Sequence, residues 1–171
     1  MVKNQSAKLP LANRSATWDK FSAAFKNYLR VHHISQVWTK ANAPGVAPER
    51  LPAVEDEQEL AAFVAKTPLT VHIGLDSGAN LSARTCSRKH MMLWSEAREA
   101  RAEEIKEHKR EKKSWSEDCE EALGYLGAAV ADCEHYSAIF EEAGDDFHDA
   151  LAAVKAEIGR ELTAPYRGRL Y

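Results

Sequence analysis

Residues 116–162, SEDCEEALGYLGAAVADCEHYSAIFEEAGDDFHDALAAVKAEIGREL, decide the predicted fold. Apolar or small side chains recur there at intervals of four and three residues, a repeat that keeps one seam of a helix against a packed partner. The positions are Cys119, Leu123, Leu126, Val130, Cys133, Ser137 and Phe140, then Phe147, Leu151, Val154, Ile158 and Leu162. Because Gly144 is typical of a helix stop, we expect an antiparallel helical hairpin whose turn lies at 142–145.

The segment before this hairpin is predicted to be a long charged helix. Residues 95–113 contain 13 charged residues and neither glycine nor proline. Such a helix lacks a broad apolar face, so we expect it to project into solvent or to meet a partner. Ser114, with Glu117 three residues later, has the spacing of a capping box, which predicts that a new helix starts there after a bend.

The N-terminal half begins with a predicted amphipathic helix. Aromatic and apolar side chains recur every three or four residues from Trp18 to His32, which indicates a helix ending near His33 or Ile34. Residues 40–54 then contain several prolines, which neither a helix nor a central strand tolerates. We therefore expect a linker or an extended surface segment there.

A short helix and two strands are expected next. Asp56, followed by Glu59, resembles a helix N-cap and predicts a short helix that ends at residues 67–68. Residues 69–75 alternate apolar and polar side chains as a strand does, and residues 81–86 are consistent with a returning strand. The predicted fold class is therefore mainly α, a helical bundle or hairpin with a small β-hairpin in the N-terminal half.

Four segments follow from these patterns, and we expect them to form one compact unit. They are a cationic arm at 1–14, a small α+β module at 15–90 with its proline-rich linker, the charged helix and hairpin at 91–162, and a basic tail at 163–171.

Composition narrows the class of protein. The formal net charge is −3, and no apolar run is long enough for a signal peptide or a membrane span, so we expect a cytoplasmic protein without a membrane partner. The cysteines at 86, 119 and 133 form an odd set without a Cys-x-x-Cys pair. Neither a disulfide framework nor a zinc ribbon is indicated.

Charge is segregated along the chain. The net charge is +6 over residues 1–50, −4 over 51–83, +4 over 84–113, −11 over 114–162 and +2 over the tail. The predicted partner-binding residues are Trp94, Arg98, Arg101, Lys106, Lys109, Arg110, Lys112 and Lys113. The predicted acidic surface consists of Glu141, Glu142, Asp145, Asp146 and Asp149. Pairing between these regions within the chain is the alternative to partner binding.

These features favour a protein without catalysis that docks on another macromolecule or on copies of itself, as an adaptor, inhibitor or assembly subunit. One alternative is a nucleic-acid-binding accessory protein whose basic arm and basic helix contact phosphates. In another, the acidic hairpin imitates a polyanion and blocks a nucleic-acid-binding partner.

Metal and cofactor sites are not expected. Two Asp-x-x-His pairs, Asp132 with His135 and Asp145 with His148, have the spacing of ligands in di-metal helical bundles. Such ligands must point into the bundle, whereas Asp132 and His135 fall off the apolar seam. We therefore expect both pairs to be solvated. Phosphate-binding loops of the Walker type, dinucleotide-binding glycines and a His-Glu-x-x-His motif are absent.

One motif raises a catalytic alternative. The seven residues Ile73-Gly74-Leu75-Asp76-Ser77-Gly78-Ala79 resemble the Asp-Ser/Thr-Gly-Ala signature of retroviral-type aspartic proteases. That resemblance implies that Asp76 activates water as half of a symmetric carboxylate pair. The same residues also resemble the first phosphate-binding turn of sugar-kinase and actin-like ATPases. A hairpin turn without catalytic function is the alternative for this segment.

Overall fold

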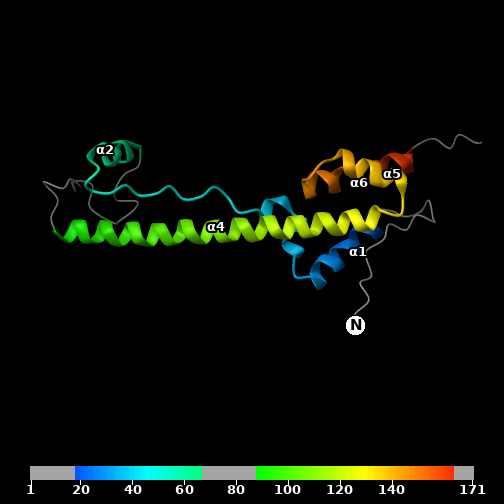
Figure 1. Cartoon of the computed structure of the whole chain (residues 1–171), viewed down its shortest axis with the longest axis horizontal. Helices are drawn as coiled ribbons and strands as arrows, with labels where there is room; N and C mark the ends of the chain where they lie inside the picture. The colour runs from blue at the N-terminus through cyan, green and yellow to red at the C-terminus, as the bar shows by residue number, and fades with distance from the viewer. Residues whose placement is uncertain (1–17, 67–87, 164–171) are drawn as a thin grey trace, which may run out of the picture. The chain divides into compact units, whose positions relative to one another are not determined.

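The computed structural model describes residues 18–66 and 88–163, and within these ranges every regular element is helical. The α-helices are α1 (Trp18–Val31), α2 (Glu57–Lys66), α4 (Arg88–Val130), α5 (Glu134–Glu142) and α6 (Phe147–Thr163), and the 3-10 helices are η1 (Ser35–Trp38) and η2 (Lys40–Asn42) (Figure 1). The predicted mainly α class is confirmed. The β-hairpin expected at 69–86, the arm at 1–14 and residues 164–171 lie outside the described ranges.

The contacts divide the chain into two compact units, whereas the sequence suggested one. Unit 1 takes residues 1–43 and 113–171, and unit 2 takes residues 44–112. Helix α4 contributes its first part to unit 2 and its last part to unit 1. Two separate apolar cores account for this division, because each unit buries its own cluster of side chains.

Helix α4 does not bend where the capping-box spacing predicted. It runs through Ser114 and Glu117 as one helix of 43 residues. In unit 1, the α4 face that includes Ala122, Leu126 and Ala129 is buried, so an unbroken helix keeps this whole face against the core. The Ser-x-x-Glu spacing at Ser114 and Glu117 therefore does not mark the start of a helix here.

The break that does occur lies at 131–133. Cys133 adopts an extended backbone (φ −126°, ψ 108°) and precedes α5 without a side-chain capping bond. The expected seam thus does not continue along one helix from Val130 to Phe140. Gly127 matters at this fold-back, because a Cβ placed there would stand 3.1 Å from the Phe140 ring. Glycine lets α5 return closely along the last turns of α4.

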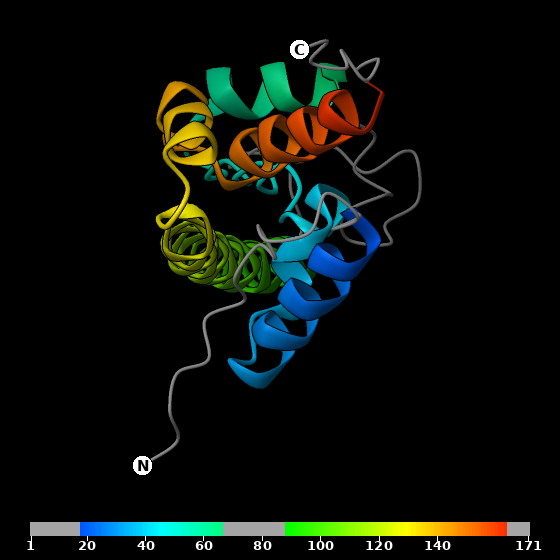
Figure 2. The ribbon, with the colours of Figure 1, turned by 90° about the vertical axis from the view of Figure 1, so that its right-hand side faces the viewer.

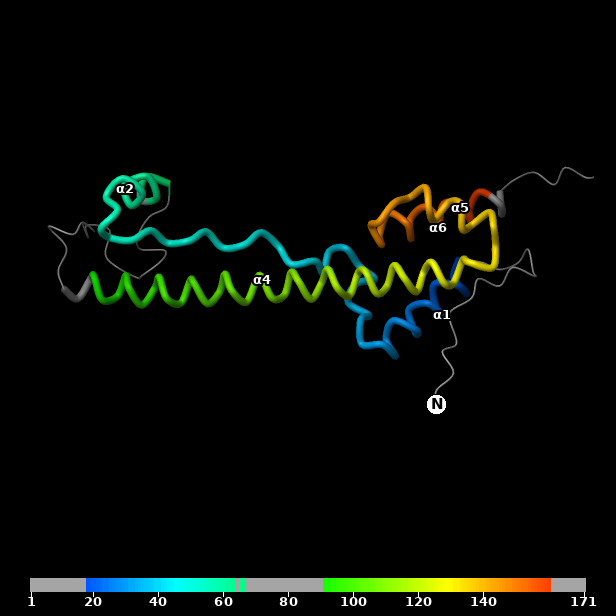
Figure 3. Tube along the Cα trace, in the orientation of Figure 1, coloured from blue at the N-terminus to red at the C-terminus, as the bar shows by residue number. Residues whose placement is uncertain are grey.

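The turn between α5 and α6 confirms the predicted hairpin stop. Gly144 has φ +83°, a backbone conformation that glycine adopts without strain. The Asp146 Oδ1 accepts hydrogen bonds from the backbone N–H groups of His148 (2.9 Å) and Asp149 (3.0 Å), which caps α6. Figure 3 shows the chain reversing here after α5 and returning as α6.

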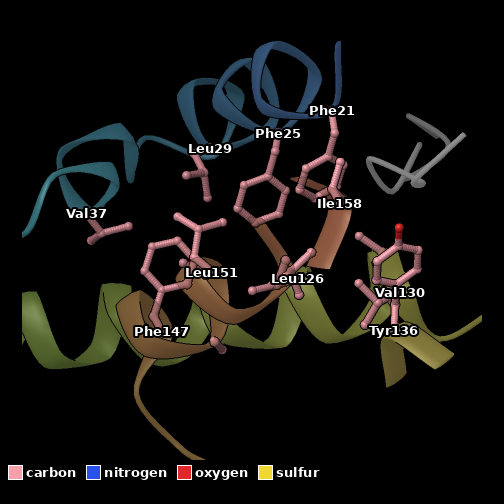
Figure 4. Close-up of a cluster of buried hydrophobic side chains, with 14 of the residues drawn as sticks. Phe21, Phe25, Leu29, Val37, Leu126, Val130, Tyr136, Phe147, Leu151 and Ile158 are labelled. Carbon is pink, nitrogen blue, oxygen red and sulfur yellow. The ribbon is translucent and has the colours of Figure 1, made fainter. Parts of the chain in front are cut away.

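The core of unit 1 joins four helices. Aromatic and aliphatic side chains of α1, led by Phe21, Phe25 and Leu29, point toward Leu126 of α4 and Ile158 of α6 (Figure 4). These side chains are at most 3% exposed. Figure 2, which looks along α4, shows α1 and α6 on different sides of the end of this helix. The aromatic stripe predicted for the first helix is therefore core.

Unit 2 has a smaller core, made by α2, the first part of α4 and the segment between η2 and α2. Its buried residues are Leu51, Val54, Leu60, Phe63 and Trp94. The Asp56 Oδ1 accepts a hydrogen bond from the Glu59 N–H (3.0 Å), as the predicted N-cap requires. Residues 44–52 form no helix or strand and extend alongside α4 (Figure 3). No described helix is long and apolar enough to cross a membrane.

Candidate functional site

The most distinctive surface of unit 1 is acidic. Four exposed carboxylates, which we call the acidic turn, lie at the end of α5, in the following turn and at the start of α6: Glu141, Glu142, Asp145 and Asp149. None of these four side chains has an ion pair or a hydrogen bond with another described residue. Their negative charge is therefore available to solvent or to a partner.

Asp146, also predicted for this surface, has a structural role. Its carboxylate caps α6, and the backbone N–H of Asp149 is the main cause that lowers the Asp146 pKa. Lys40 and the backbone N–H and ring of His148 act in the same direction. The charge on Asp146 is thus partly committed to the helix terminus, where a negative group is favourable.

The predicted basic surface on α4 is largely neutralised within its own helix. Lys106 pairs with Glu103 (3.3 Å), Arg110 with Glu107 (3.0 Å) and Lys113 with Glu117 (3.6 Å). These three contacts all join residues three or four positions apart on α4. Lys109 and Lys112 are exposed. The net charge of each sequence segment does not show that a glutamate lies one helical turn away from each of these three cations.

Three residues predicted for partner binding face inward in unit 2. Trp94 is wrong as a surface residue, because it is 0% exposed and belongs to the core. Its indole N–H donates to the carbonyl of Pro52 (2.9 Å). Arg101 donates to the carbonyl of Glu49 (3.0 Å), and its Nε lies 2.9 Å from Glu104. Arg98 holds a buried Nε that has no hydrogen-bond partner.

The expectation that both Asp-x-x-His pairs are solvated fails for His148, whose side chain is only 14% exposed. The His135 Nε2 lies 2.8 Å from the Glu157 Oε1, and the other oxygen of Glu157 lies 2.9 Å from Arg160. The His148 Nε2 instead donates to the carbonyl of Val37 (2.7 Å). Among the residues that the structure describes, no three His, Cys, Asp or Glu side chains come together as a metal ion requires.

A polar cluster between α1 and α4 was missed by the sequence reasoning. The Tyr125 hydroxyl donates to Glu121 and lies 3.2 Å from the His32 Nδ1. The Tyr28 ring packs against the rings of Tyr125 and His32. The hydrogen bond to Glu121, then burial, raises the Tyr125 pKa to about 12. A phenol with a raised pKa gives up its proton less readily, and the ring contacts of Tyr28 with His32 and Tyr125 pack α1 on α4.

The pKa of the Cys119 thiol is shifted in the direction opposite to that of a reactive cysteine. Burial is the main cause that raises the Cys119 pKa, and the carboxylates of Asp146 and Asp118 raise it further. A nucleophilic cysteine needs the opposite shift, because the thiolate is the reactive form. Cys119 lies at the edge of the unit 1 core, consistent with a packing role.

The catalytic candidate Asp76 lies outside the described ranges, so its role stays a prediction. Comparisons of the chain with protein-family models, with curated proteins and with solved structures give no match. The geometry of the described residues is therefore the basis for a functional proposal.

Proposed function

We propose that this protein is a binding protein without catalysis whose unit 1 docks on a basic partner through the acidic turn. The observation that carries the proposal is that Glu141, Glu142, Asp145 and Asp149 have no cationic partner among the residues that the structure describes. Unpaired surface charge of one sign steers a partner of the opposite sign and selects against others.

The described part of unit 1 carries an acidic excess. The described residues of unit 1 contain 14 acidic and seven basic residues, whereas those of unit 2 contain 11 acidic and 10 basic residues. In the full sequence, five further basic residues belong to unit 1, so the two units differ little in net charge. The charge that acts on a partner is therefore local to the acidic turn, where four exposed carboxylates lie close together in sequence.

The same surface supports an inhibitor role if the basic partner is itself a nucleic-acid-binding protein, because the acidic turn would then occupy the site for phosphates. Direct binding of nucleic acid by α4 is less well supported. Lys106, Arg110 and Lys113 would have to exchange their glutamates for phosphates, while those glutamates stay on the same helix.

The test is affinity capture with the full chain from the source cell, followed by titration of the purified partner. We expect substitution of the acidic turn (E141Q, E142Q, D145N and D149N together) to abolish capture of the partner. Affinity of the unmodified chain should fall as salt is raised, because exposed charges are screened. Mass measurement of the complex separates a foreign partner from a second copy of the chain.

The matched control removes the same number of charges from unit 2. Glu55, Glu96, Glu99 and Glu111 are exposed, and no described ion pair includes them, so their replacement by glutamine should leave capture intact. Equal loss in both variants would show a net-charge effect instead of a docking surface. Capture that survives in the acidic-turn variant would refute the proposal, as would a complex insensitive to salt.

A further inference from the structure

An extended segment of unit 2 is held to α4 by its backbone carbonyls. The Trp94 Nε1 donates to the carbonyl of Pro52 (2.9 Å), and the Arg101 Nη1 donates to that of Glu49 (3.0 Å). The His108 Nε2 lies 2.7 Å from the carbonyl of Gly45 and must carry the proton, since a carbonyl can only accept. We call these three side chains of α4 the donor ladder.

The spacing of the donor ladder matches the rise of an extended chain. Its residues follow at intervals of seven, which places all three on one face of the helix about 10.5 Å apart. Their acceptors are separated by three and four residues, and a polyproline-type chain rises about 3.1 Å per residue, or about 11 Å on average over these steps. The spacing of the donors along α4 therefore matches the spacing of the acceptor carbonyls along the extended segment.

The chemistry is that of peptide recognition. Prolines at 44, 48 and 52 favour an extended backbone, and at these three positions the carbonyl is the only backbone group that can pair. Indole and guanidinium donors beside apolar contacts are typical of sites that bind proline-rich segments. Leu51 supplies the apolar contact here, at 3% exposed.

The segment that occupies this face does not satisfy it fully. Arg98 lies on the same side of α4 between Trp94 and Arg101, and its buried Nε has no hydrogen-bond partner in the part of the chain that the structure describes. Residues 45–47 are exposed to solvent, and Val46 is 97% exposed. A peptide offering an acceptor to Arg98 would gain a bond that residues 44–52 do not make.

We propose that the donor ladder is a binding surface for extended, proline-containing peptides and that residues 45–52 occupy it as an intramolecular ligand. The partner is a segment of the same chemistry carried by another protein, which displaces the intramolecular one. This inference concerns unit 2 and does not depend on the acidic turn of unit 1.

The probe is a fluorescent synthetic peptide with the sequence of residues 43–54, APGVAPERLPAV, titrated into the full chain and followed by anisotropy. Pro48→Gly loosens the intramolecular segment and alters no ladder residue, so this variant should bind the peptide several-fold more tightly than the unmodified chain. In the Pro48→Gly background, Arg101→Gln should weaken binding about fivefold, the effect of one lost hydrogen bond.

Lys109→Gln is the matched control, because it removes a cation from the same helix at an exposed position. This change should leave peptide affinity unaltered. Equal affinities with and without Arg101→Gln would overturn the proposal, and so would a Pro48→Gly variant that keeps its helical circular dichroism but binds no peptide. If Pro48→Gly lowers the helical signal, the comparison of Arg101→Gln with Lys109→Gln is made in the unmodified chain at millimolar peptide. Failure to compete with the intramolecular segment there would equally overturn it.

Discussion

Unit 1 and unit 2 use the same helix, α4, in different ways. Among the described residues of unit 1, 15 form one buried cluster, and α4 contributes an apolar face to it. Among those of unit 2, the buried cluster has five residues, and α4 adds the donor ladder that holds an extended segment by its carbonyls. A small core supplies little hydrophobic free energy, so directional bonds carry more weight in unit 2.

This difference teaches that a highly charged helix need not stand alone in solvent. The α4 face that contains Trp94, Arg101 and His108 is polar by sequence, yet it packs against a neighbour that also presents polar atoms. The indole N–H of the buried Trp94 is paired, while the hydrogen bonds of Arg101 and His108 add contacts at the exposed end of the same face. We expect the stability of unit 1 to fall most when a buried side chain is shortened, and that of unit 2 to fall when a hydrogen-bond donor is removed.

Loss of volume in unit 1 should give the largest effect. Phe25 is 0% exposed and packs on Phe21, Trp38 and Phe147. Phe25→Ala leaves a cavity and should lower the free energy of unfolding by about 3–5 kcal/mol, measured by urea denaturation. Ala24→Ser, at the exposed neighbouring position, should change it by less than about 0.5 kcal/mol. A loss below about 1 kcal/mol for Phe25→Ala would contradict the importance of this core.

Loss of one donor tests unit 2. Trp94→Phe keeps an aromatic ring but removes the indole N–H, which leaves the carbonyl of Pro52 buried without its donor. We expect a cost of about 1–3 kcal/mol. Hydrogen exchange measured by mass spectrometry should speed up for peptides from residues 44–66.

Met92→Leu is the control for that change, because Met92 is 58% exposed and the two side chains have similar volumes. Exchange within residues 44–66 should stay as in the unmodified chain. If Trp94→Phe instead accelerates exchange mainly in α5 and α6, the two units would not differ as described.

Loss of a helix cap is a smaller, pH-dependent change in unit 1. The Asp146 pKa is lowered in the folded state, so its carboxylate stabilises the fold above the unfolded pKa, and this contribution is lost as pH falls through the folded pKa. Asp146→Asn keeps an oxygen acceptor but not the charge and should cost about 0.5 kcal/mol at pH 7. The difference between the variant and the unmodified chain should then shrink below about pH 4, where the urea midpoint is compared.

Asp145→Asn serves as the reference, since the structure gives the Asp145 side chain no capping bond. Its effect on the urea midpoint should be smaller at pH 7. A cost for Asp146→Asn that stays constant down to about pH 3 would show that the charge plays no part.

The smallest effect concerns a polar contact of unit 1. The Tyr125 pKa of about 12 arises first from its hydrogen bond to Glu121. Because the protonated phenol is favoured in the folded state, this stabilisation is present below the unfolded pKa of about 10 and is lost as pH rises toward 12. Glu121→Gln should lower the Tyr125 pKa toward 10, seen in the ultraviolet titration of tyrosinate. Glu120→Gln, at an exposed neighbouring position, should leave the titration unchanged.

Local sequence signals predicted several helix ends and the core of unit 1. The stripe through Phe21 and Phe25, the cap at Asp56 and the stop at Gly144 each depend on residues within one or two turns of one another. The fold-back at 131–133 was missed, because the four-three repeat continues through it without glycine or proline. Its cause is tertiary, since α5 must return along α4.

The surfaces were harder to predict than the helices. The burial of Trp94 could not be predicted locally, because its acceptor, the carbonyl of Pro52, is 42 residues away in sequence. The acidic turn could be read directly, since its residues are adjacent and exposed. The neutralisation of Lys106 and Arg110 was visible in the one-turn spacing to glutamate, but a count of net charge conceals it.

The matched periods of the donor ladder constrain how the length of this chain can vary. One residue inserted in α4 between Trp94 and Arg101 would rotate the later donors by about 100° away from their carbonyls. One residue inserted between Glu49 and Pro52 would shift the acceptors by about 3 Å. Only paired changes, seven residues in the helix with three or four in the extended segment, would preserve every bond, so we expect insertions and deletions in unit 2 to occur in coupled steps.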